Sequence, residues 1–199
     1  MTEPLPAPAV PAPLSLPKSE VEAEESSIAA TTWAWLRDLL LSLLIALLIV
    51  LFLYRPVKVD GTSMMPTLQN DSRLFIDEFS YRFGLGHIKR GDTVVFWFPE
   101  DTTKSYIKRV IGLPGDKIQI QNGYVVLNGK KLRESYVPRE YRDDQNYRLI
   151  TVPPNDYFVL GDHRDASNDS RAWGFVPRSY IYGKAVFVFW PFRDIGTIN

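Results

Sequence analysis

The longest apolar segment of the chain runs from Leu39 to Tyr54, and Ser42 is its only polar position before Tyr54. Extended back through Trp33, it reaches about twenty residues, the length that an α-helix needs to cross the hydrocarbon core of a bilayer. Aromatic residues at both ends suit the two membrane interfaces. The pattern predicts a transmembrane anchor over residues 31–55.

Two other interpretations of this segment are less consistent with its residues. A buried core helix normally carries a polar stripe, and this segment has none. A cleavable signal peptide needs a small-x-small site after its apolar region, whereas the following residues are RPVKVDGT. An uncleaved anchor is therefore favoured, with Arg37 and Asp38 at headgroup level or paired with each other.

From Pro56 onward the pattern changes to short runs rich in Val, Ile, Phe and Tyr, separated by turn dipeptides such as Asn122-Gly123 and Asn128-Gly129. These runs predict strands at 73–79, 93–98, 105–111, 117–121, 124–127, 157–160 and 184–190. No long amphipathic helical period appears. We expect one mainly β, antiparallel domain over residues 56–199.

Residues 1–30 differ from both of these regions. Six of the fifteen prolines lie in the first seventeen residues, and the acidic stretch from Glu20 to Glu25 follows. Such a segment has little apolar surface to bury, so a disordered tail is expected.

The composition of the chain argues against several classes of function. The chain has 199 residues and a formal net charge of zero, which gives no reason to expect nucleic-acid binding. It contains no cysteine, which excludes disulfides, thiol catalysis and Cys-ligated zinc. Its two histidines, His87 and His163, are few for a His-built metal centre.

Ser63 lies in the segment GTSMMPTL just after the anchor. Alone it is most simply a turn serine, because a nucleophilic serine needs an activating base. A triad with His163 is one possibility. However, His163 sits in a polar loop where a surface role is equally plausible, and His87 has no acidic neighbour in sequence.

Lys108, in YIKRVIGLPGD, offers a different base. In a strand, Lys108 and Arg109 point to opposite faces, so one of them faces the less solvated side. Burial favours the neutral amine of lysine, whereas arginine keeps its proton. A neutral Lys108 would accept the Ser63 proton. The alternative is a lysine whose stem packs while its ammonium reaches solvent.

A third polar segment, GDHRDASNDSR, spans residues 161–171. It lacks the acidic spacing and central glycine of an EF-hand, and its arginines oppose a bound cation. Carboxylate–guanidinium pairs that hold a site in place are the better interpretation.

Taken in order behind a single anchor, SMMPTL, RGDTVVF, YIKRVIGLPGD and GDHRDASNDSR resemble the sequence boxes of bacterial type I signal peptidases. The resemblance covers the anchor and nearly all of residues 56–195. It implies a fold of two antiparallel-sheet subdomains behind one N-terminal transmembrane helix, with an apolar surface near the membrane. Aromatic residues such as Trp97, Phe98, Trp190 and Phe192 are candidates for that surface.

The resemblance also implies roles for individual residues. Ser63 would be the nucleophile and Lys108 the general base, with Ser167 orienting the lysine amine. Asp162 would pair with Arg109, Asp169 would pair with Arg171, and Met64 would line the substrate cleft. Gly61 is a departure, because some members carry there a serine that helps to stabilise the oxyanion. His163 stands where asparagine is common, which argues against a catalytic histidine.

The implied activity is that of a membrane-bound serine endopeptidase that removes signal peptides from translocated preproteins. No metal or organic cofactor is implied, and a monomer in the cell membrane is expected. Arg55 and Lys58, which follow the span, would by charge place the β domain in the cytoplasm, but the resemblance implies the extracytoplasmic side. Two alternatives stay open: a non-catalytic tethered β-domain that binds exported proteins, and a repressor-cleaving type of Ser-Lys protease.

Overall fold

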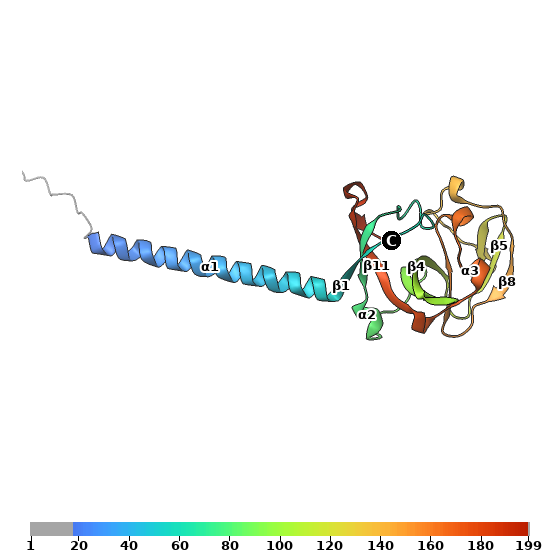
Figure 1. The fold of residues 1–199 in the computed structure, drawn as a ribbon, viewed down its shortest axis with the longest axis horizontal. Helices are drawn as coiled ribbons and strands as arrows, with labels where there is room; N and C mark the ends of the chain where they lie inside the picture. Colours follow the sequence, from blue (N-terminus) through green and yellow to red (C-terminus); the bar gives the residue numbers. More distant parts are fainter. Residues whose placement is uncertain (1–17, 199) are drawn as a thin grey trace, which may run out of the picture. The chain divides into compact units, whose positions relative to one another are not determined.

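A computed structural model describes residues 18–198 of the chain. The chain divides near Val50 into two compact units, one helical and one rich in β-strands (Figure 1). The β-rich unit carries the four motif segments named above and contains every residue of the candidate site. Each unit is described by itself below.

The described part of the helical unit is helix α1, Lys18–Leu53, whose last residues, from Val50, belong to the β-rich unit. Within it, Thr31–Val50 is long and apolar enough to cross a membrane, and none of it is buried inside the protein. The Arg37 guanidinium lies 2.9 Å from the Asp38 carboxylate, which confirms the expected pairing.

Both ends of α1 differ from the expectation. Residues 18–30, expected in a disordered tail, are helical, and their many Glu and Ala residues are strong helix formers. The rest of the expected tail, residues 1–17, lies outside the described residues. At the other end, Tyr54 and Arg55 belong to a strand rather than to the anchor helix.

The β-rich unit holds two antiparallel sheets, which confirms the expected fold class. The eight-stranded sheet has the order β1-β2-β11-β3-β4-β9-β10, with β12 paired to β11. Its strands are β1 Tyr54–Lys58, β2 Arg73–Asp77, β3 Thr93–Phe98, β4 Asp101–Gly112, β9 Asp156–Leu160, β10 Val176–Pro177, β11 Ile181–Trp190 and β12 Gly196–Thr197.

The smaller sheet has the order β7-β6-β5-β8. It consists of β5 Lys117–Gln121, β6 Tyr124–Leu127, β7 Lys130–Lys131 and β8 Tyr147–Thr151. In the view of Figure 1, β5 and β8 lie on the side of the β-rich unit away from β1. Short helices connect the strands: α2 Phe79–Arg82, α3 Ser170–Trp173, η1 Arg139–Tyr141, η2 Arg164–Ala166, η3 Arg178–Tyr180 and η4 Phe192–Asp194.

Asparagine–glycine pairs turn the chain between β5, β6 and β7. Asn122 and Asn128 have φ values of 49° and 50°, and the glycines that follow them have φ values of 74° and 81°. Two successive positive φ values are the geometry of a two-residue hairpin turn, and Asn-Gly is the pair that adopts it most readily. The two predicted hairpins are therefore confirmed.

Strand β4 links the two halves of the large sheet and positions the site. On one edge it pairs with β3, from Asp101 to Arg109. On the other edge it pairs with β9 only from Arg109 onward. The edge of β4 before Arg109 therefore has no neighbouring strand within the described part of the chain, and it borders an open cleft.

The aromatic residues assigned to an exposed surface do not all lie there. Trp97, Trp190 and Phe192 are exposed, Phe192 by 73%. Phe98 is buried, because its ring stacks on Tyr106 at 4.5 Å and packs edge-on against Trp173. Phe98 is thus a core residue, and its assignment to the surface was wrong.

Candidate active site

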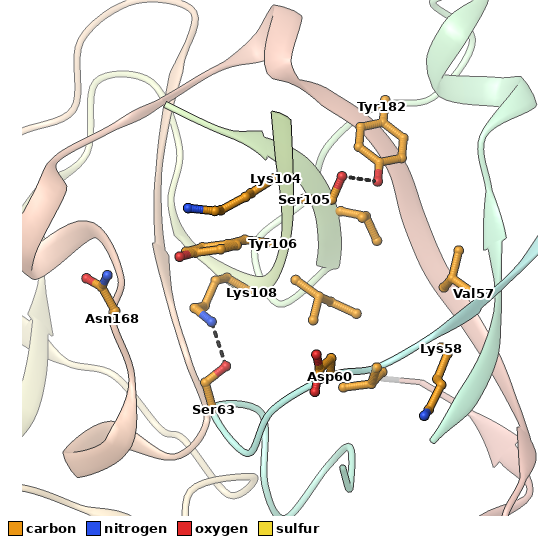
Figure 2. Close-up of a pocket in the computed structure, with 13 residues that line it drawn as sticks. Val57, Lys58, Asp60, Ser63, Lys104, Ser105, Tyr106, Lys108, Asn168 and Tyr182 are labelled. Atoms are coloured by element: carbon orange, nitrogen blue, oxygen red, sulfur yellow. Dashed lines mark hydrogen bonds between the residues drawn. The ribbon is translucent and has the colours of Figure 1, made fainter. Parts of the chain in front are cut away.

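Ser63 lies in the loop between β1 and β2, and two neighbouring side chains anchor that loop. Met64 and Leu68 are each 1% exposed and pack in the same apolar cluster as Leu74 and Ile76 of β2. The N–H of Leu68 donates to the carbonyl of Met64 at 2.9 Å. With these apolar side chains fixed in the core, Ser63 is left half-buried at the wall of the cleft (Figure 2).

Met64 therefore does not have the position expected for a substrate-binding residue. It lies beneath the cleft and is absent from the cleft lining. Its side chain is buried among aliphatic neighbours, so it supports the loop from below and has no surface to offer a substrate.

Lys108 faces Ser63 from strand β4. Its Nζ lies 2.6 Å from Ser63 Oγ, and the side chain is almost fully buried, with 4% exposed. Burial lowers the pKa of Lys108 from 10.5 to about 8, because the ammonium loses its hydration; Asp169 and Asp162 oppose this shift and Arg171 adds to it. A substantial fraction of Lys108 is therefore neutral in mildly alkaline solution and able to accept a proton.

The cleft beside this pair has a volume of about 590 Å³. Its apolar wall comes from β1, β3, β4 and β11, whereas Asp60, Lys104 and Asn168 add polar groups (Figure 2). The Tyr182 hydroxyl lies 2.9 Å from Ser105 Oγ, and its ring lies 4.7 Å from that of Trp97. The reactive pair thus opens onto a mainly apolar groove along the unpaired edge of β4.

Arg109 points away from Lys108 and forms a buried ion pair. Its Nε and Nη2 donate to the two carboxylate oxygens of Asp162 at 2.9 and 2.8 Å, and the side chains are 1% and 0% exposed. Thr67 Oγ1 donates to the same carboxylate at 2.6 Å. The structure thus brings Asp162 and Arg109 together as the sequence predicts, and ties them to the Ser63 loop through Thr67.

Replacing Arg109 with Met tests the energetic importance of this pair. It should lower the free energy of unfolding by about 3–5 kcal/mol, because the Asp162 carboxylate would stay buried without its guanidinium. Urea unfolding of the detergent-solubilised protein would measure the change. Arg55→Met is the matched control, since the Arg55–Glu78 pair is 3.4 Å long and its arginine is exposed, so about 1 kcal/mol or less is expected. Equal effects of the two substitutions would contradict the assigned role.

Asp169 and Arg171 form the second expected pair. The Arg171 Nε and Nη2 groups donate to Asp169 at 2.8 and 2.9 Å, and Arg171 also binds Asp143. Asp169 in turn accepts from the backbone N–H of Gly161 at 3.1 Å. These carboxylates are thus matched by guanidinium groups, and residues 18–198 contain no cluster of ligands suited to a metal ion.

Ser167 lies against the Ser63 loop but does not orient the amine. A Cβ at Gly161 would fall 2.2 Å from Ser167 Oγ and 2.4 Å from the Ser63 carbonyl oxygen, so the two loops meet at Gly161. The Ser167 hydroxyl is buried and has no hydrogen-bond partner among the described residues. The expected hydrogen bond to Lys108 is absent; the Lys108 amine contacts Ser63 Oγ at 2.6 Å.

His163 is not the base of a triad. Its Nδ1 lies 3.2 Å from the carbonyl oxygen of Thr62, and its Nε2 lies 3.0 Å from the Asp165 carboxylate. Ser63 Oγ has Lys108 as its partner instead. His87 is an exposed loop residue.

The sequence did not identify Glu134 as a residue of the site. The Glu134 side chain is fully buried and accepts from Arg164 at 2.5 Å and from Arg142 at 3.1 Å. Arg164 also donates to the Gly161 carbonyl at 2.9 Å, so Glu134 braces the loop that supports Ser63. Arg164 lies in a segment noticed for its charges, but its partner is thirty residues away in a stretch with no motif.

Several known proteins are similar to this chain. Residues 32–190 match the family model described as signal peptidase, peptidase S26. A probable signal peptidase I-2 of Synechocystis is 38% identical over 90% of this chain and 84% of that protein. Signal peptidase I S of Bacillus subtilis is 36% identical over 92% of this chain and 100% of its own length. A signal peptidase I structure from Enterococcus faecalis, 30% identical, covers 50% of this chain and 97% of its own with a TM-score of 0.45.

Proposed function

Because the chain belongs to the signal peptidase family, peptidase S26, we propose that it removes N-terminal signal peptides from preproteins, with Ser63 as nucleophile and Lys108 as general base. The observation that carries the proposal is the 2.6 Å contact between Lys108 Nζ and Ser63 Oγ at the wall of an open cleft. A non-catalytic β-domain would have no need of a buried lysine whose pKa is lowered next to a serine hydroxyl.

The reaction follows from these positions. Ser63 Oγ attacks the scissile carbonyl while the neutral Lys108 amine takes its proton and later gives it to the leaving amine. Water, activated by the same amine, then releases the acyl group from Ser63. The two charge pairs around Asp162 and Asp169 hold the loop and strand that present these groups.

The substrate backbone has a ready partner in β4. The edge of β4 before Arg109 is unpaired and runs along the cleft toward Lys108. An extended peptide can add to such an edge through main-chain hydrogen bonds, which leave its alternate side chains facing the cleft wall. We propose that the substrate carries small residues at the first and third positions before the cut, where they would face Val57, Val95 and Ile107.

A preprotein series tests this function. With the purified protein in detergent, replacing alanine at the first position before the cut by tryptophan should lower the cleavage rate at least about 100-fold, because a site that selects small residues, as proposed, rejects the larger side chain. The same replacement at the second position is the control, since that side chain points to the opposite side of an extended peptide. Equal rates for all three preproteins would contradict the proposal.

The membrane is the second proposed partner. The helix Thr31–Val50 fits an anchor, and the exposed Trp190 and Phe192, with rings 4.7 Å apart, suit contact with lipid headgroups. We propose a single span, a monomeric enzyme, and a β-rich unit on the extracytoplasmic side of the cell membrane, where signal peptides emerge.

The side of the membrane can be measured directly. Alkaline phosphatase, which is active only outside the cytoplasm, is fused after Asn199 and should be active, whereas a cytoplasm-specific reporter at the same place should not. The opposite result would overturn the proposed orientation. It would not bear on the cleavage chemistry, which the preprotein assay tests separately.

A further inference from the structure

His163 contacts both peptide groups that flank the nucleophile. Its backbone N–H donates to the carbonyl of Ser63 at 3.1 Å, and its ring Nδ1 lies 3.2 Å from the carbonyl oxygen of Thr62. The close approach of the two loops is possible because Gly161, two residues earlier, has no side chain to strike the Ser63 carbonyl. One residue of the supporting loop thus holds the Ser63 backbone from both sides.

The contact with Thr62 determines where the Ser63 N–H points. The Thr62 carbonyl and the Ser63 N–H belong to one planar peptide group, in which they point in opposite directions. Fixing the oxygen therefore fixes the direction of the N–H. The N–H of Met65 donates to the same oxygen at 3.0 Å, whereas the N–H of Ser63 makes no hydrogen bond within residues 18–198.

The direction of this N–H matters because Gly61, two residues before Ser63, supplies no hydrogen-bond donor for the oxyanion. Gly61 has no side chain, and its own N–H is already bound to Asn70 Oδ1 at 2.7 Å. Gly61 also has a φ of 106°, a region that other residues rarely adopt, so a serine hydroxyl is not readily accommodated there. The Ser63 N–H is left as the donor for the oxyanion that forms on attack.

The His163 ring is itself held in place. Its Nε2 lies 3.0 Å from Asp165 Oδ1, and its edge packs on the ring of Tyr141 at 4.5 Å with an interplanar angle of 81°. The contact with Tyr141 opposes rotation of the ring away from Thr62. The Asp165 contact adds to this in the protonated imidazole, because a neutral ring has one N–H and the Thr62 carbonyl accepts it.

From this geometry we infer that His163 is a positioning residue that aims the Ser63 N–H at the oxyanion, in place of the side-chain donor that Gly61 lacks. The inference rests on the proposed function, because it needs Ser63 to be the nucleophile. His163 contacts no substrate and takes no proton from Ser63; it acts through the Thr62–Ser63 peptide group.

Two substitutions distinguish hydrogen-bond donation by the His163 ring from packing of that ring against Tyr141. H163F keeps an aromatic ring against Tyr141 but removes the N–H, whereas H163N removes the ring but keeps an amide N–H at the place of Nδ1. For a preprotein substrate, kcat of H163F should fall at least about tenfold with KM within about twofold, since loss of a whole oxyanion donor costs about 100- to 1,000-fold. H163N should stay within about threefold of the wild type.

A peptide aldehyde gives a readout that packing alone would not move. It forms a tetrahedral adduct with the nucleophile, so its inhibition constant should weaken in H163F by the same factor as kcat, while that of an uncleavable substrate peptide stays unchanged. H87A, at the exposed histidine, is the control and should equal the wild type in every measurement. Thermal unfolding of each variant reports whether it is folded, and H163A replaces H163F if the latter is not.

Several outcomes would overturn the inference. One is a wild-type kcat in H163F or its replacement. Another is an H163N variant that is unfolded or as slow as H163F. The third is an H163F variant that binds the aldehyde and the uncleavable substrate peptide more weakly by the same factor. Ser63→Ala, run in parallel, separates this from a failure of the proposed function. If that variant cleaves the preprotein as the wild type does, the nucleophile is wrong; if it is inactive while H163F is normal, only the positioning role is wrong.

Discussion

Replacing Ser63 with Ala should lower the rate of preprotein cleavage by at least about 10,000-fold, because the variant has no oxygen with which to form the acyl-enzyme. Removing this oxygen leaves the supporting groups in place, since the loop is anchored by Met64 and Leu68 beneath it. The variant should therefore fold and bind substrate peptide normally. The measurement is a single-turnover assay with enzyme in excess over a labelled preprotein.

Ser105→Ala is the matched control for this prediction. Ser105 lines the same cleft, and its hydroxyl lies 2.9 Å from that of Tyr182, but it is remote from the contact between Lys108 and Ser63. Its rate should stay within about tenfold of the wild type. A Ser63→Ala variant as active as Ser105→Ala would rule out Ser63 as the nucleophile.

Replacing Lys108 with Met should have an effect of similar size, because no other base contacts Ser63 Oγ within residues 18–198. Lys108→Arg should be equally inactive, since a guanidinium keeps its proton. Lys104→Met is the control: Lys104 lines the same cleft, but its side chain is 63% exposed and it pairs with Asp101. Its activity should be close to that of the wild type.

The pH dependence of the wild type tests the same assignment. The base form of Lys108 is the neutral amine, and the pKa of Lys108 is lowered to about 8. Below this value kcat/KM should rise about tenfold per pH unit, and above it the rate should level off. A profile that is flat between pH 6 and 9 would contradict a lysine base.

Burial of Lys108 should lower the stability of the folded protein, although the same burial favours its role as a base. The pKa of Lys108 is 10.5 before burial and about 8 in the folded protein, so the unfolded chain binds the extra proton between these values. Wild-type stability is therefore lowest below pH 8 and rises toward pH 10.5. Below pH 8, Lys108→Met should be more stable than the wild type by on the order of 2 kcal/mol in urea unfolding.

Much of the fold could be predicted because local patterns specify it. The strands at 93–98, 117–121 and 124–127 have the predicted boundaries, since turn residues flank each apolar run. Strand β8, YRLIT, was missed because its residues are mostly exposed and alternate without a clear apolar face. The start of β1 was assigned to the anchor because Tyr54 continues the apolar run of the helix.

The site was predictable only in part, because burial depends on distant segments. The alternation along β4 correctly separates Lys108 from Arg109, but it does not show that both are buried, one against the Ser63 loop and the other against Asp162. Met64 was placed in the cleft by the family resemblance, yet the loop turns it into the core. Glu134 and the contacts of His163 join segments far apart in the chain, and no local pattern reports them.

The proposed membrane span at Thr31–Val50 has a consequence for how this enzyme would meet its substrate. A signal peptide is itself embedded in the bilayer, so enzyme and substrate diffuse in the same two-dimensional layer. Confinement to one layer raises their local concentration in the way that a linker raises it between two joined modules. High intrinsic affinity for the signal peptide is then not required, and occupancy of the site would follow the surface density of preproteins in the membrane rather than their concentration in solution.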